Sequence, residues 1–172
     1  MPATHPKICC GGIHEVQSEI VVRRVIEAPR GLVFSAWTDP DALSRWWGPK
    51  GFSNPVCEVD ARPGGGIRIE MCGPDGTLYP MAGLFRDVVP PEKLVFTSAA
   101  LNDDGHPLFE VEHTVTFAER WGTTRVEARA RVVWSWPGAP PDLEGMEDGW
   151  QQSLERLAGE LAGVPRRSTV TS

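Results

Sequence analysis

The sequence lacks any apolar run approaching the roughly 18 residues that a membrane span needs. It also lacks the apolar core of a signal peptide near its start. These two absences predict a soluble, cytoplasmic protein without a membrane span. Positive charge is in short supply as well, because 23 acidic residues outnumber 17 Lys and Arg and give a net charge of −6. A nucleic-acid partner is therefore not expected.

Cysteine is scarce and is poorly spaced for a disulfide or zinc framework. The four cysteines form no C-x-x-C pair: Cys9, Cys10, Cys57 and Cys72. The first two lie with His5 and His14 in residues 1–17, a segment without hydrophobic periodicity. Four such ligands can in principle gather a soft metal, but no framework fixes their geometry. We expect a flexible arm there, with no metal site and no cofactor.

Tyrosine is nearly absent, with one residue, whereas tryptophan is abundant, with seven. So much rigid apolar surface suits a thick core or the wall of a pocket. Trp46 and Trp47 are adjacent, and neighbouring helical residues point about 100° apart. We therefore expect one of them to enter the core or a cavity mouth and the other to cover a neighbouring loop.

Hydrophobic periodicity predicts a strand, two short helices and then six more strands. The first strand spans residues 18–27, and Pro29 opens a helix directly after it. A second helix starts with Asp39 as its N-cap and ends at Gly48. The later strands alternate apolar and polar residues and are joined by short turns: 56–62, 66–72, 79–89, 93–101, 109–118 and 123–134. One face of this antiparallel sheet must therefore be covered.

The cover is predicted to be a helix at the end of the chain. Six apolar residues recur there at steps of three and four: Leu143, Met146, Trp150, Leu154, Leu157 and Leu161. They mark one stripe on a helix of about 20 residues, long enough to cross a sheet. We expect Trp150 to anchor this helix on the concave face of the sheet, with Gly149 permitting close approach to a neighbouring element.

The predicted fold class is α+β, with seven antiparallel strands curled around a long C-terminal helix and two short helices after the first strand. A single domain is expected over residues 18–163, preceded by the flexible arm 1–17 and followed by a flexible tail 164–172. Where a curved sheet meets one helix, a wedge-shaped gap remains. Large side chains fill such a gap, or it stays open as a cavity.

Four stretches, in this order, resemble one protein family: residues 39–52 (DPDALSRWWGPKGF), 60–65 (DARPGG), 90–97 (PPEKLVFT) and 149–157 (GWQQSLERL). The chain resembles the homologues of the heat-shock-protein-90 ATPase activator, in the START / Bet v 1-like (SRPBCC) superfamily. The resemblance covers about residues 18–163 and implies the helix-grip fold, in agreement with the order of elements predicted above. The eukaryotic co-chaperone of this family carries a further N-terminal domain, where this chain has a short arm. Many bacterial members are single domains without an established activity, so the resemblance implies the fold more firmly than the function.

The leading functional hypothesis is a cavity for a small apolar or amphipathic molecule. Its candidate wall residues share an expected inward or cavity-mouth position: Trp47, Phe52, Met71, Met81, Phe85, Phe96, His113, Val115, Trp134, Trp150 and Leu154. His113 is the polar member, and a buried histidine needs a hydrogen-bond partner. Asp87 falls on the same inward phase but lies outside the cavity if its strand bends.

Two alternatives remain open. The resemblance implies a co-chaperone-like partner that stimulates a chaperone ATPase in the stress response. The superfamily also contains cyclase and hydratase enzymes, for which His113 is the one candidate acid or base. No catalytic constellation is visible in the sequence, so an enzyme is the less favoured class and no catalytic residue is predicted. The sequence leaves the choice between monomer and homodimer open.

Overall fold

The computed structural model describes residues 19–138 and 141–162. Within these ranges the chain forms, in order, β1 (Glu19–Ile26), α2 (Arg30–Thr38), α3 (Pro40–Trp46), β2 (Ser53–Val59), β3 (Gly66–Cys72), β4 (Leu78–Val89), β5 (Lys93–Leu101), β6 (Pro107–Arg120), β7 (Thr123–Ser135) and α4 (Leu143–Ala162). The predicted arm 1–17, with its cysteines and histidines, and the predicted tail 164–172 lie outside the described residues.

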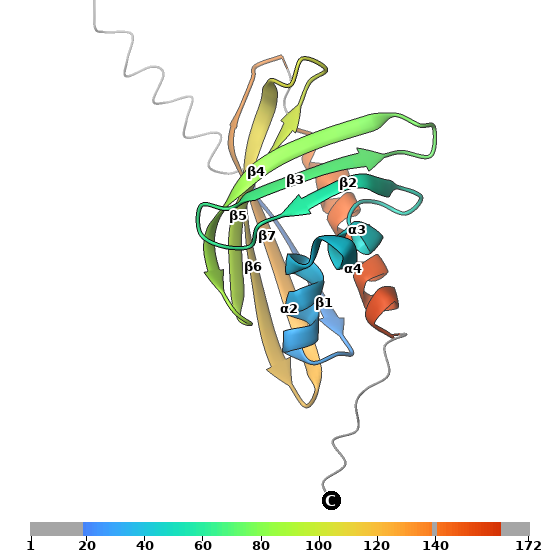
Figure 1. The fold of residues 1–172 in the computed structure, drawn as a ribbon, viewed down its shortest axis with the longest axis vertical. Helices are drawn as coiled ribbons and strands as arrows, with labels where there is room; N and C mark the ends of the chain where they lie inside the picture. Colours follow the sequence, from blue (N-terminus) through green and yellow to red (C-terminus); the bar gives the residue numbers. More distant parts are fainter. Residues whose placement is uncertain (1–18, 139–140, 163–172) are drawn as a thin grey trace, which may run out of the picture.

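All seven strands belong to one antiparallel sheet with the order β1-β7-β6-β5-β4-β3-β2. Strands β2 to β7 follow one another as neighbours, and β1 closes the far edge beside β7. The sheet curls around α4, as Figure 1 shows, and α3 packs between β2 and α4. The predicted helix-grip fold is confirmed, with every predicted strand and helix present.

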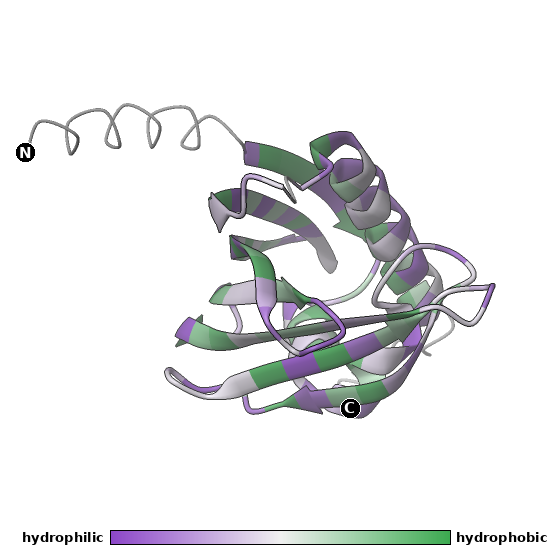
Figure 2. Ribbon diagram, turned by 90° about the horizontal axis from the view of Figure 1, so that it is seen from above, coloured by the Kyte–Doolittle hydropathy of each residue, from purple (hydrophilic) through white to green (hydrophobic). Residues whose placement is uncertain are grey.

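The core lies between the concave face of the sheet and α4. Hydrophobic and hydrophilic bands alternate along the strands in Figure 2, and in β6 the buried residues Val111, Val115 and Phe117 alternate with more exposed ones. On α4 the predicted stripe is buried from Trp150 to Leu161, whereas Leu143 and Met146 are less deeply covered. The first turn of α4 therefore lies above a less filled part of the gap.

Two register shifts turn predicted inward residues away from the core. In β4 a shift between Phe85 and Asp87 places Asp87 opposite Val95, and its carboxylate pairs with the Lys93 ammonium at 3.0 Å. In β7 a shift places Trp134 opposite Glu110. Directly opposed residues share a face of the sheet, so each shift moves the residue to the outer face. Asp87 thus lies outside the cavity, the outcome that was expected only if its strand bends.

Candidate functional site

A cavity of about 440 Å³ lies between the sheet and the first turns of α4. Its volume falls in the range of about 300–1,000 Å³ that is typical of small-molecule pockets. The wall is formed by β3, β4, β5, β6, the β5–β6 turn and α4, which contributes Met146. This is the end of the molecule where the β3–β4 and β5–β6 hairpins project in Figure 1.

Three predicted residues line this cavity, namely Met71, Met81 and His113. Six others are buried in the core outside the wall: Trp47, Phe85, Phe96, Val115, Trp150 and Leu154. The ring of Phe52 lies 5.7 Å from that of the wall residue Tyr79, measured between centroids. Trp134 is half-buried on the outer face and is not part of the wall.

Most of the remaining wall was not predicted from the sequence. Six of the missed residues are aliphatic: Leu78, Pro80, Ala100, Leu101, Leu108 and Val111. Ser98 and Asp103 are the missed polar members. A signal for Ser98 was present, because it stands two residues after the inward Phe96 on the same strand.

His113 and Ser98 form a hydrogen-bonded polar pair in the wall. Ser98 Oγ and His113 Nε2 are 2.7 Å apart and share a hydrogen bond. The imidazole stacks on Phe96, with centroids 4.7 Å apart, and its centroid lies 5.4 Å from that of Trp150. Burial lowers the pKa of His113 from 6.5 to about 3, since a charged imidazolium is poorly solvated there. The imidazole is therefore neutral at physiological pH.

The opposite end of the gap is filled by aromatic rings. Trp150 stacks on Trp37 with centroids 5.7 Å apart, and it meets Trp47 edge-on at 5.2 Å. Trp46 packs on Trp37 at 4.7 Å and donates from Nε1 to the Ala36 carbonyl. This aromatic cluster is defined by Trp37, Trp46, Trp47 and Trp150, all of them buried.

The expectation that Trp46 and Trp47 point apart, with one of them covering a neighbouring loop, was wrong, because both are buried and both pack on Trp37. Adjacent residues point about 100° apart only where both are helical. Helix α3 ends at Trp46, and Trp47 is an extended C-cap with φ −63° and ψ 135°. Both rings can therefore turn to the same cluster.

Helix α4 holds the loop after α3 with polar side chains. Arg156 Nη1 donates to the carbonyls of Trp47, Gly48 and Pro49 at 3.0–3.1 Å, and Nη2 donates to Arg45 at 3.0 Å. Ser153 Oγ accepts from the Gly48 amide at 3.1 Å. This clamp satisfies carbonyls that the end of a short helix leaves unpaired, and it fixes the position of Trp47.

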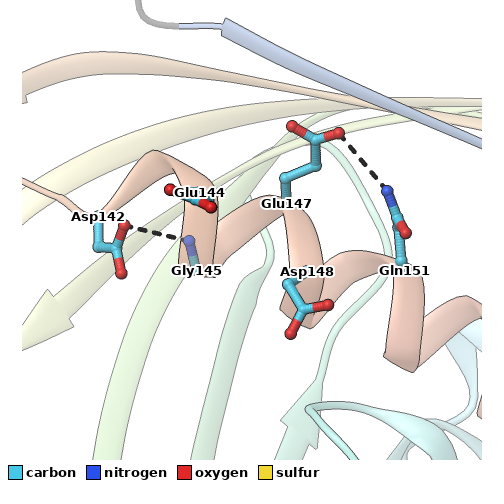
Figure 3. Close-up of a pocket in the computed structure, with 6 residues that line it drawn as sticks. All are labelled: Asp142, Glu144, Gly145, Glu147, Asp148 and Gln151. Carbon is cyan, nitrogen blue, oxygen red and sulfur yellow. Dashed lines mark hydrogen bonds between the residues drawn. The ribbon is translucent and has the colours of Figure 1, made fainter.

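A shallow acidic depression of about 530 Å³ lies along the first turns of α4, and Figure 3 shows its six lining residues. Its polar groups bond within the helix: Asp142 accepts from the Gly145 amide at 3.1 Å, and Gln151 donates to Glu147 at 3.5 Å. The first bond caps the start of the helix, and the second joins two successive turns of it. The depression therefore has an explanation in helix capping.

Two further features concern residues 19–138 and 141–162, the ranges that the structure describes. No group of three His, Cys, Asp or Glu side chains in these ranges is arranged to hold a metal ion. None of the helices there is both long and apolar enough to cross a membrane.

Fold and cavity together define a helix-grip protein with an internal pocket. The sequence model of one family, described as "Activator of Hsp90 ATPase homolog 1-like protein", matches residues 27–162, and the chain belongs to this family. The resemblance stated from the sequence is thereby confirmed.

Solved structures of similar fold come from several bacteria. A protein of Chromobacterium violaceum is 31% identical with a TM-score of 0.74, over 86% of this chain and 99% of that one. A protein of Nitrosomonas europaea is 29% identical with a TM-score of 0.69, over 84% and 94%. The AHSA1 protein of Silicibacter pomeroyi is 26% identical with a TM-score of 0.70, over 84% and 97%. A comparison with curated proteins finds no match.

Proposed function

We propose that this protein binds one small apolar or amphipathic molecule in the cavity between the sheet and α4. The observation that carries the proposal is the hollow of about 440 Å³, whose wall is apolar except for a few polar groups such as Ser98 and His113. Pockets of this kind bury most of a small ligand and use a few placed polar groups to orient it. Met71, Met81 and Met146 add flexible, polarizable surface that adapts to different ligand shapes.

Binding is favoured over acid–base catalysis by the state of His113. An efficient general base has a pKa near the working pH, whereas burial holds the pKa of this imidazole at about 3. The ring nitrogen Nε2 bonds to a serine hydroxyl, not to a carboxylate that would stabilise an imidazolium. The cyclase or hydratase alternative therefore has a weak base as its one candidate.

The co-chaperone alternative is supported by the family description, which names an activator of the Hsp90 ATPase. It would be tested by adding the protein in excess to a purified bacterial chaperone and measuring ATP turnover. Because the cavity is a feature of this chain itself, it carries the proposal and the chaperone role stays the alternative.

The proposal is tested by titrating the protein with fatty alcohols, sterols and flavonoids while following tryptophan fluorescence. Trp150 lies beside His113 and should report occupancy. Ala100→Phe places a ring in the cavity and should abolish saturable binding, because Ala100 belongs to the wall. Val25→Phe adds the same ring at a position on β1 that is 61% exposed, and should change nothing. A panel without any saturable response, or binding that survives Ala100→Phe, contradicts the proposal.

A further inference from the structure

We propose that the Ser98–His113 pair is a hydrogen-bonding anchor for an uncharged oxygen, so that the ligand is a neutral amphiphile such as a long-chain or fused-ring alcohol or ketone. A carboxylate is rejected by the same site. This step rests on the proposed function, since it names the class of molecule that occupies the same cavity.

The anchor follows from the hydrogen-bonding capacity of the two side chains. A serine hydroxyl has one donor and two acceptor sites, and a neutral imidazole has one of each. Their mutual bond of 2.7 Å uses one donor and one acceptor. If Ser98 donates in that bond, its oxygen can still accept from a ligand hydroxyl. If His113 donates, the Ser98 hydroxyl is free to donate to a ligand carbonyl.

The position of the pair fits this role. Ser98 on β5 and His113 on β6 both belong to the cavity wall, with Val111 and Ala100 as apolar neighbours on the same two strands. A ligand whose chain or rings fill the apolar space can therefore bring one polar atom to the pair. A wholly apolar ligand would leave these polar groups without that bond, which costs binding free energy.

The charges around the cavity select against an anion. Among the described residues that form the wall, none is Lys or Arg, and Asp103 adds a negative charge. His113 supplies no positive charge, because burial keeps its imidazole neutral. A carboxylate would have to leave water without a cationic partner, and this desolvation weakens its binding.

The test compares ligands that share one chain and differ in head group: decanol, decanoate and decylamine, each measured by calorimetry below its aggregation concentration. Decanol should bind saturably to the wild-type protein, and decanoate should bind at least about tenfold more weakly. Decylamine should also bind more weakly than decanol, because its ammonium group must leave water as well. Equal affinity for decanol and decanoate would overturn the anchor, and stronger binding of decylamine than of decanol would overturn the neutral class.

A pair of variants tests the hydrogen bond itself. Ser98→Ala should weaken decanol binding by about tenfold, while binding of naphthalene, which has no polar atom, should not weaken. Thr114→Val removes a hydroxyl next to His113 on the outward phase of β6 and should leave both ligands unaffected. Loss of decanol binding in Thr114→Val, or none in Ser98→Ala, contradicts the anchor.

The two proposals fail in different ways. If no ligand of either series binds the wild-type protein, the proposed function is wrong. If naphthalene and decanoate bind as well as decanol and Ala100→Phe blocks all three, the cavity binds ligands but the anchor is wrong. The comparison of head groups uses the wild-type chain, so it does not depend on whether a variant folds.

Discussion

The gap between the curled sheet and α4 has two ends, and they are built differently. At one end the aromatic cluster fills the space, with Trp150 stacked on Trp37. At the other end the wall residues are smaller or more flexible, for example Ala100, Ser98 and Met81, and a cavity remains. One sheet and one helix thus make both a core and a pocket. Side-chain volume decides whether an end becomes core or pocket, together with the cover that α2 and α3 provide at the aromatic end.

The two ends also differ in how their loops are held. Arg156 and Ser153 tie the loop after α3 to α4 at the aromatic end. At the cavity end, Leu78 and Tyr79 at the start of β4 are about half exposed. Few buried contacts and exposed backbone bonds make a region open more easily. We therefore expect the free energy of unfolding to depend mostly on the aromatic end and ligand affinity on the cavity end.

The largest expected effect is that of Trp150→Ala, which removes the ring joining the aromatic cluster to His113. Truncating a buried tryptophan costs about 3–5 kcal/mol, so the midpoint of urea unfolding should fall sharply. Trp150→Phe should keep the fold and leave ligand preference unchanged, because Trp150 lies outside the cavity wall. As a control, Trp121→Ala changes a side chain that is 89% exposed and should shift the free energy of unfolding by less than about 0.5 kcal/mol. Equal unfolding midpoints for the two alanine variants would remove the distinction between the ends.

The sequence predicted the order of elements well because hydrophobic periodicity reports on burial directly. It predicted Met71, Met81 and His113 in the cavity wall for the same reason. It failed at Trp134, because alternation along one strand carries no sign of a one-residue register shift.

The sequence predicted a gap between the sheet and the C-terminal helix, but it did not predict which part of the gap stays open. Whether rings fill a gap depends on their direction in space, and the end of α3 after Trp46 set that direction for Trp47. Ser98 was missed because a hydroxyl in a strand has no hydrophobic signal, although its phase with Phe96 pointed inward.

The next effect in size is a pH dependence at the cavity end. The pKa of His113 falls from 6.5 to about 3 on folding because of burial, so the unfolded chain takes up a proton between these values and the folded chain does not. This contribution to stability is complete above pH 6.5 and is lost as the pH falls toward 3. Between pH 6.5 and about 5 the loss should be about 2 kcal/mol.

Urea unfolding at several pH values checks this expectation on two variants. His113→Gln should flatten the pH dependence by that amount, and His106→Gln, at an exposed position in the β5–β6 turn, should not. If His113→Gln keeps the full slope, the histidine is already solvated in the folded protein and the cavity is wetter than its wall implies.

Arg156→Lys should have a smaller effect, at the aromatic end. A lysine has a single ammonium group in place of the planar guanidinium and cannot bond to all four carbonyls. Most of the bonds to the loop after α3 are therefore lost. We expect a loss of about 1.5 kcal/mol in the free energy of unfolding, with unchanged ligand affinity. Arg125→Lys, on the outer phase of β7, is the matched control and should be neutral. A change in ligand affinity without a change in stability would show that the clamp serves the cavity instead.

The smallest expected effect has the opposite sign and lies where the two ends meet. Gly149 was expected to permit a close approach, yet a Cβ there would lie 3.7 Å from Pro49 Cγ, an ordinary contact. Alanine should therefore fit, and Gly149→Ala should stabilise α4 by about 0.5–1 kcal/mol because alanine restricts the unfolded chain and favours helix. Gly159→Ala, in the same helix with open space around its Cβ, should give a similar gain.

By contrast, Gly83→Ala in β4 should destabilise strongly, since its Cβ would overlap the Thr97 carbonyl. Thermal melts of the three variants check this, and a loss at Gly149 with a gain at Gly159 would show that the loop at Pro49 is packed more tightly than the aromatic end requires.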